Sequence, residues 1–117
     1  MSGCSCGGKK VLLFPCAGAA DVGELSDRVS RKLAKDGKGN LLCTAAIGAN
    51  ISGKMEAAKK ADTLITIDGC GDLCAKKVLE KAGFTPKSYN LEALGFTKGK
   101  TEVNSAAIDK AAASMSL

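Results

Sequence analysis

The chain has 117 residues, of which 45% are hydrophobic, 25% are charged and 3% are aromatic. This length fits one domain and leaves no room for two good cores, and this balance of residues excludes an intrinsically disordered protein. The formal charge is +5, but the lysines are dispersed and no aromatic residues alternate with them, so we expect no nucleic-acid partner.

The first half of the chain predicts two strands, each followed by a helix. The apolar run "KKVLLFP", closed by Pro15, is typical of a strand. In "ELSDRVSRKLAKDG", apolar residues recur every four positions on one helical face: Leu25, Val29 and Leu33. Asp21 with Glu24 resembles a capping box at the start of this helix, and Gly37 is placed to end it. The run "NLLCTAAIGA" predicts a second strand, or a strand and a turn, and "SGKMEAAKKAD" predicts a second helix.

The second half continues the same alternation. "TLITI" predicts a strand buried on both faces, and "GDLCAKKVLEKAG" predicts a helix that begins near Gly71 and ends at Gly83. A short fourth strand is expected near residues 89–91, and a last helix from Asn104 or Ser105 to Ser114. Alternating strands and helices indicate right-handed βαβ units. We therefore expect a three-layer α/β fold, Rossmann-like or flavodoxin-like, with a parallel sheet of about four strands and helices on both faces.

The domain organisation and location follow from the same patterns. Residues 1–8 are expected to form a flexible Gly/Cys tail, and residues 9–117 a single domain that is monomeric. The sequence has neither the pattern of a secretory signal peptide nor an apolar run long enough to span a bilayer, which predicts a cytoplasmic protein without membrane contact. Thiols are kept reduced in the cytoplasm, so the six cysteines are interpreted as metal ligands or redox groups before disulfides.

Four cysteines fall where the predicted strands end: Cys16, Cys43, Cys70 and Cys74. Cys16 follows the first strand by one residue, Cys43 lies in or at the end of the second, and Cys70 follows the third by two residues. The carboxyl ends of parallel strands meet at one edge of a sheet, and neighbouring strands lie about 4.8 Å apart. Cys74 lies four residues beyond Cys70, so the two share one face if both are in the first turns of the following helix. The sequence therefore predicts four sulfur atoms in one pocket.

A set of four thiolates suits tetrahedral zinc or an iron–sulfur cluster, and the residues alone leave both open. The sequence contains no histidine, which excludes imidazole ligands. Helix N-termini at this edge are expected to lower the pKa values of the thiols and favour thiolates. A thiol oxidoreductase or oxyanion reductase is the alternative, but the chain has no C-x-x-C and no C-x5-R motif. A binding protein is therefore favoured over an enzyme.

Two further features have alternative interpretations. Cys4 and Cys6 form a C-x-C on the Gly-rich tail, which is either a mobile metal clamp that reaches the main site or a terminus with incidental thiols. Asp68 could be an outer hydrogen-bond partner of the metal site, but a helix cap is the commoner role for such an aspartate and is favoured.

The stretch "GANISGKM" has the G-x-x-x-x-G-K spacing of a phosphate-binding loop over Gly48–Lys54. Met55 replaces the Ser or Thr that would hold magnesium. The expected context, after the second strand and before a helix, is suitable. Nucleotide or anion binding by Lys54 is therefore a weaker alternative.

Three stretches resemble the DGC-domain family of small proteins, which is named for a central Asp-Gly-Cys: "FPCAGAADVGELSDRVSRKL", "CTAAIGA" and "IDGCGDLCAKKVLEKAGF". The resemblance extends from about Lys10 to the last helix. It implies zinc binding through four cysteines, which here are Cys16, Cys43, Cys70 and Cys74. Asp68 and Gly69 complete the motif. The resemblance implies no reaction, and it leaves the role open among metal carrier, buffer, sensor and structural site.

Overall fold

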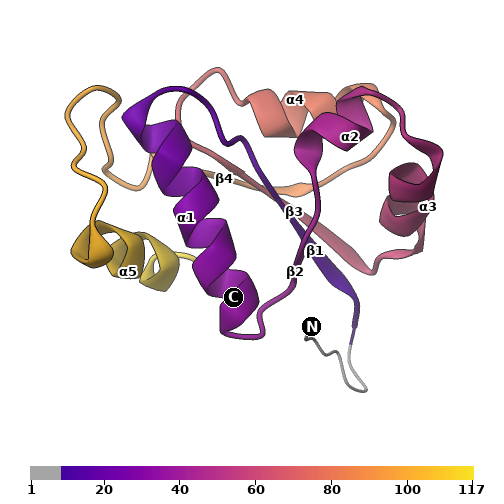
Figure 1. Cartoon of the computed structure of the whole chain (residues 1–117), viewed down its shortest axis with the longest axis horizontal. Coiled ribbons are helices and arrows are strands. Elements are labelled where there is room, and N and C mark those ends of the chain that lie inside the picture. Colours follow the sequence, from indigo (N-terminus) through magenta and orange to yellow (C-terminus); the bar gives the residue numbers. More distant parts are fainter. Residues whose placement is uncertain (1–8) are drawn as a thin grey trace.

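In the part of the chain that the structure describes, four strands form one all-parallel sheet in the order β2-β1-β3-β4. The structure is a computed structural model that describes residues 9–117 (Figure 1). The strands are β1 (Val11–Pro15), β2 (Asn40–Leu41), β3 (Thr63–Asp68) and β4 (Lys87–Asn90). The strand order reverses between β1 and β3, and the same order is found in flavodoxin-like folds, in which this reversal is the topological switch point. The predicted fold class is confirmed.

Within residues 9–117, five helices cover the two faces of this sheet. They are α1 (Asp21–Lys35), α2 (Thr44–Gly48), α3 (Ser52–Lys60), α4 (Cys74–Lys81) and α5 (Ser105–Ala113). Figure 1 shows α1 and α5 on one side of the strands and α2, α3 and α4 on the other. None of the helices in residues 9–117 is long and apolar enough to cross a membrane.

Alternate side chains of the strands pack into two separate hydrophobic cores, because successive residues of a strand point to opposite faces of the sheet. Leu13 belongs to the core beneath α1 and α5, whereas its neighbours Leu12 and Phe14 belong to the core beneath α2, α3 and α4. The predicted stripe of α1 lies in the first core, with all three residues at most 3% exposed: Leu25, Val29 and Leu33. Helices therefore pack against both faces of the sheet, and the ends of the strands are left as the place for a functional site.

Three local predictions were wrong. The second strand is only Asn40–Leu41, and the following residues form α2 instead, since a short Ala-rich run is compatible with either state. The helix after β3 begins at Cys74 and not near Gly71, because Leu73 takes a left-handed conformation with φ 52° just before it. Asp21 makes no capping box, and the residue before it, Ala20, is the N-cap.

The carboxylate of Asp21 instead ties a distant loop to the start of α1. It accepts hydrogen bonds of 2.9 Å from the backbone N–H groups of Gly99 and Thr101 and one of 2.8 Å from Val22. The bonds from Gly99 and Thr101 lower the pKa of Asp21 below its usual value. The predicted helix ends are confirmed: Gly37 and Gly83 have φ angles of 80° and 96°, which suit a glycine at this position.

Candidate functional site

The topological switch point between β1 and β3 is occupied by two cysteines. Cys16 follows β1 directly, and its backbone N–H donates to Ile67 O at 3.0 Å, extending the pairing with β3 by one residue. Cys70 lies in the turn after β3 and packs partly against the core beneath α1. In sheets of this topology the crevice outside the carboxyl ends at the switch point is where ligands bind.

The glycine of the Asp-Gly-Cys motif permits a close backbone contact at this point. A Cβ atom on Gly69 would lie 2.6 Å from the carbonyl carbon and oxygen of Val22 in α1, which is closer than real Cβ contacts. Gly23, the next residue of α1, is packed as tightly against Gly18. The turn that carries Cys70 is therefore pressed directly onto the first turn of α1.

The sulfur atom of Cys16 has hydrogen-bond partners already in place. The backbone N–H of Gly69 points to Cys16 Sγ at 3.4 Å, and the hydroxyl of Ser26 lies 3.1 Å from the same sulfur. Among residues 9–117, Cys16 is the only cysteine whose sulfur makes such contacts. A backbone N–H that donates to sulfur, as Gly69 does here, stabilises the negatively charged form of the sulfur.

Asp68 fixes the start of α4, the helix that begins with Cys74. Its side chain is only 1% exposed, and its two oxygens accept hydrogen bonds from Ala75 N–H at 2.7 Å and Lys76 N–H at 3.0 Å. Burial raises the pKa of this carboxyl, although the two backbone N–H groups partly offset the effect. Asp68 therefore caps the helix as predicted, but from outside the N-cap position, which is Leu73. Cys70 precedes the helix, so the condition for its sharing a helical face with Cys74 is not met.

Several groups raise the pKa of Cys74, the first residue of α4. Partial loss of hydration has the largest effect, and the nearby carboxylates of Asp68 and Asp72 raise the pKa of this thiol further. The prediction that the helix N-terminus lowers the pKa is therefore wrong for Cys74, because loss of hydration and the carboxylates at the same helix end outweigh it.

Cys43 reaches the same edge from β2. It is the exposed N-cap residue of α2, and the next residue, Thr44, donates its hydroxyl to Pro15 O at 2.8 Å. This bond ties the start of α2 to the end of β1. Cys16 and Cys43 line one open pocket of about 490 Å³, which also includes Arg31.

The structure brings the four predicted thiols to one edge without gathering them into a closed cluster. In residues 9–117 the cysteines are free of disulfides, with Cys16 and Cys70 half-buried and Cys43 and Cys74 exposed. In the same part of the chain, no three His, Cys, Asp or Glu side chains form a group that could hold a metal ion. The donor type suits zinc, and the separation of the sulfurs means that ligation by all four would require side chains to move.

Ser26 contacts the candidate site, and the sequence did not single it out. It lies on the buried face of α1 beside the apolar stripe and is completely buried. The available signal was a pair of hydroxyls, Ser26 and Ser30, on the buried face of α1, because buried polar groups usually have a specific partner. Cys4 and Cys6 lie outside the described residues.

The predicted phosphate-binding loop, Gly48–Lys54, does not lie between a strand and a helix. Gly48 ends α2 and does not follow a strand, so Gly48–Lys54 is a link between two helices. The backbone N–H groups of three residues donate to carbonyls of α2 rather than pointing outward: Ala49, Asn50 and Ile51. A phosphate cradle needs such N–H groups free, so the prediction of a suitable strand–loop–helix context was wrong.

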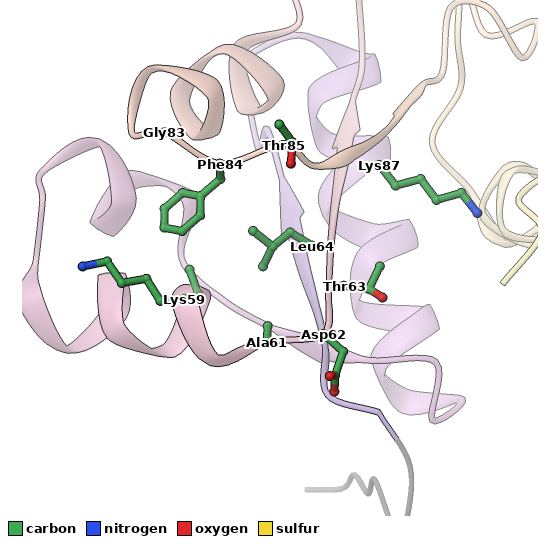
Figure 2. Close-up of a pocket in the computed structure, with 10 residues that line it drawn as sticks. Lys59, Ala61, Asp62, Thr63, Leu64, Gly83, Phe84, Thr85 and Lys87 are labelled. Atoms are coloured by element: carbon green, nitrogen blue, oxygen red, sulfur yellow. The ribbon is translucent and has the colours of Figure 1, made fainter.

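A pocket of about 470 Å³ lies at the opposite edge, where β3 and β4 begin (Figure 2). It is lined by apolar groups such as Leu64 and Phe84 and by two lysines, Lys59 and Lys87. Figure 2 shows that the two lysine side chains extend away from each other. The pocket therefore offers no converging charge for an anion.

These observations define a doubly wound parallel α/β domain that carries free thiols at its topological switch point. The chain belongs to the DGC domain family, whose model matches residues 12–115 and thus all of the elements described here except the first residue of β1. No match was found among curated proteins or among solved structures. The resemblance noted in the sequence is confirmed at the level of the family.

Proposed function

We propose that the chain binds one zinc ion through four thiolates at the carboxyl edge of the sheet: Cys16, Cys43, Cys70 and Cys74. The observation that carries this proposal is the position of Cys16 and Cys70 on either side of the switch point, with the Gly69 N–H directed at the Cys16 sulfur. A backbone N–H that donates to the sulfur suits a thiolate ligand. It stabilises the negative charge on the sulfur without adding a further ligand to the metal.

The carboxylates near Cys74 support a cation at this place. Loss of hydration, followed by the charges of Asp68 and Asp72, raises the pKa of this thiol, so the thiol resists ionisation in the metal-free protein. A divalent ion reverses this balance, because a coordinating thiol loses its proton outright. Asp68 and Asp72 then favour the bound ion instead of opposing the thiolate.

Ligation by all four cysteines requires the exposed pair to approach the half-buried pair. Tetrahedral Zn–S bonds of about 2.3 Å place the sulfurs roughly 3.8 Å apart. Cys43 is an N-cap and Cys74 is the first residue of its helix, and both side chains are exposed. They can therefore change rotamer without disturbing either core. A site with two exposed ligands is accessible to chelators, which favours a carrier, buffer or sensor over a buried structural ion.

Elemental analysis combined with alkylation tests the proposal. Protein purified reduced and without oxygen should contain, or take up, one zinc per chain and remain colourless. Zinc should protect Cys43 and Cys74 from alkylation, as mapped by peptide mass spectrometry. A visible absorption band with bound iron would instead indicate an iron–sulfur cluster. Absence of both metals, with no tight uptake of added zinc, would refute metal binding and leave thiol chemistry as the alternative.

A further inference from the structure

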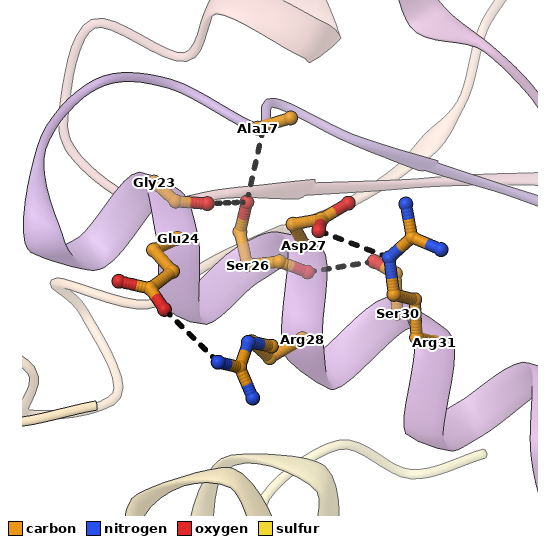
Figure 3. Close-up of polar contacts among 8 residues, drawn as sticks. All are labelled: Ala17, Gly23, Glu24, Ser26, Asp27, Arg28, Ser30 and Arg31. Carbon is orange, nitrogen blue, oxygen red and sulfur yellow. Dashed lines mark hydrogen bonds and ion pairs between the residues drawn. The ribbon is translucent and has the colours of Figure 1, made fainter. Parts of the chain in front are cut away.

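The buried hydroxyl of Ser26 lies next to the sulfur of Cys16. The residue is 0% exposed, and its Oγ lies 3.1 Å from Cys16 Sγ. The same oxygen accepts the backbone N–H of Ala17 at 3.4 Å and donates to Gly23 O at 3.0 Å (Figure 3). These contacts link the first turn of α1 to the loop that leaves β1, so the hydroxyl is held close to one thiol.

We propose that Ser26 is a positioning residue for the metal site: it fixes the Cys16 sulfur and donates its hydroxyl hydrogen bond to that sulfur when Cys16 is a thiolate ligand. This inference rests on the proposed zinc binding. Ser26 does not touch the ion and acts only through Cys16.

The donors and acceptors of a hydroxyl allow Ser26 to hydrogen-bond the Cys16 sulfur in both its thiol and its thiolate form. A hydroxyl has one proton and accepts with two lone pairs. In the thiol form, the Cys16 S–H donates to Ser26 Oγ, and the Ser26 proton goes to Gly23 O. In the thiolate form, rotation about the Cβ–Oγ bond turns the Ser26 proton from Gly23 O to the sulfur. Hydrogen bonds to an ionised acceptor are roughly twice as strong as neutral ones, so the second arrangement favours the ligand form.

Ser30 provides a matched control one turn further along α1. It is also 0% exposed, and its hydroxyl donates to a carbonyl four residues earlier, Ser26 O, at 2.8 Å (Figure 3). Within residues 9–117 its hydroxyl has no contact with a cysteine sulfur. The two serines therefore share helix, burial and hydrogen bonding to a backbone carbonyl. They differ in that only Ser26 contacts the loop after β1, through the Cys16 sulfur and the backbone N–H of Ala17.

The test compares Ser26→Ala with Ser30→Ala in the full chain. Zinc affinity is measured by competition with a chromogenic chelator, and thermal stability is measured on the metal-free proteins. Loss of an outer hydrogen-bond partner typically weakens metal binding by about 10- to 100-fold. We expect at least a roughly tenfold loss for Ser26→Ala, little change for Ser30→Ala, and similar melting temperatures for both. Equal affinities in the two variants would overturn the role of Ser26.

The controls separate this inference from the proposed function. If wild type binds zinc and both variants bind it equally well, only the role of Ser26 fails. If wild type binds no zinc, the proposed function itself fails and takes this inference with it.

A second measurement needs no variant and applies even if Ser26→Ala does not fold. Wild-type protein loaded with cadmium-113 should show scalar coupling between the metal and the Ser26 hydroxyl proton, transmitted through the sulfur of Cys16. The hydroxyl is fully buried, which slows exchange of this proton with water. Coupling to cysteine protons without coupling to Ser26 would contradict the proposal.

Discussion

Substitution of the glycine in the Asp-Gly-Cys motif tests how closely the β3 turn packs on α1. In Gly69→Ala the new Cβ would lie 2.6 Å from the carbonyl carbon of Val22, whereas carbon atoms pack comfortably at about 3.5 Å. The turn and the helix must therefore separate by roughly 0.9 Å. Both sides of the contact are backbone, so no side chain can rotate away to relieve the clash.

The expected cost is at the upper end of the range for overpacking, about 2–3 kcal/mol. For a domain of this size, about 1 kcal/mol corresponds to roughly 4 °C in melting temperature, so Gly69→Ala should melt roughly 8–12 °C below wild type. The separation also lengthens the contact from Gly69 N–H to the Cys16 sulfur. We therefore expect weaker zinc binding in this variant in addition to lower stability.

Gly71→Ala is the matched control in the same turn. The nearest atom to its added Cβ would be Glu92 Oε1 at 3.6 Å, an ordinary contact. A compatible Gly→Ala change is neutral or stabilising by about 0.4–1 kcal/mol. Thermal unfolding followed by circular dichroism measures both variants. If Gly69→Ala melted as high as Gly71→Ala, the close packing of the motif on α1 would be refuted.

Three further predictions use other parts of the chain. Because the folded-state pKa of Asp21 lies below its usual 3.8, its stabilising effect is present above that pH and is lost as the pH falls through the folded-state value. Asp21→Asn should therefore melt below wild type at pH 7, with the gap closing in acid; a gap independent of pH would contradict this. Asp68→Ala leaves two backbone N–H groups at the start of α4 without their acceptor and should cost about 2 kcal/mol or more. Asp68→Asn keeps one acceptor and should cost less, so equal melting of Asp68→Ala and wild type would disprove the cap. Changing both Cys4 and Cys6 to serine should leave zinc stoichiometry unchanged, because the chain between Cys6 and Lys9 is too short to reach Cys16. Cys6 precedes Lys9 by three residues, which span at most roughly 11 Å. Cys16 follows Lys9 by seven residues of largely extended chain, a distance of roughly 23 Å. A lost equivalent of zinc in elemental analysis would show that the tail contributes.

The sequence predicted the layout of the fold where periodicity was strong. The stripe through Leu25, Val29 and Leu33 defined α1, and the β-branched run of β3 defined a central strand. The short run around Cys43 could not be resolved, because a few apolar residues fit a strand or a helix equally well. The two-residue β2 is held by pairing with β1, which is a property of the sheet and not of those residues.

The sequence was enough to predict where in the fold the cysteines of the candidate site lie, but not which residues they contact. The carboxyl edge follows from parallel topology, so the positions of Cys16, Cys43 and Cys70 could be expected from the ends of the strands. The contact between Cys16 and Ser26 depends on the path of the loop, in which Ala17 has a φ of 48°. The partners of Asp21 are 78 and 80 residues away along the chain. Such non-local contacts leave no local pattern in a single sequence.

X-ray absorption at the zinc edge tests most directly whether separated cysteines share one ion. The measurement uses zinc-loaded wild-type protein at one equivalent, beside the Cys43→Ser variant. We predict four sulfur neighbours near 2.3 Å in wild type and one sulfur fewer in the variant. A first coordination shell of oxygen or nitrogen atoms, or an identical spectrum in the Cys43→Ser variant, would contradict a four-thiolate site.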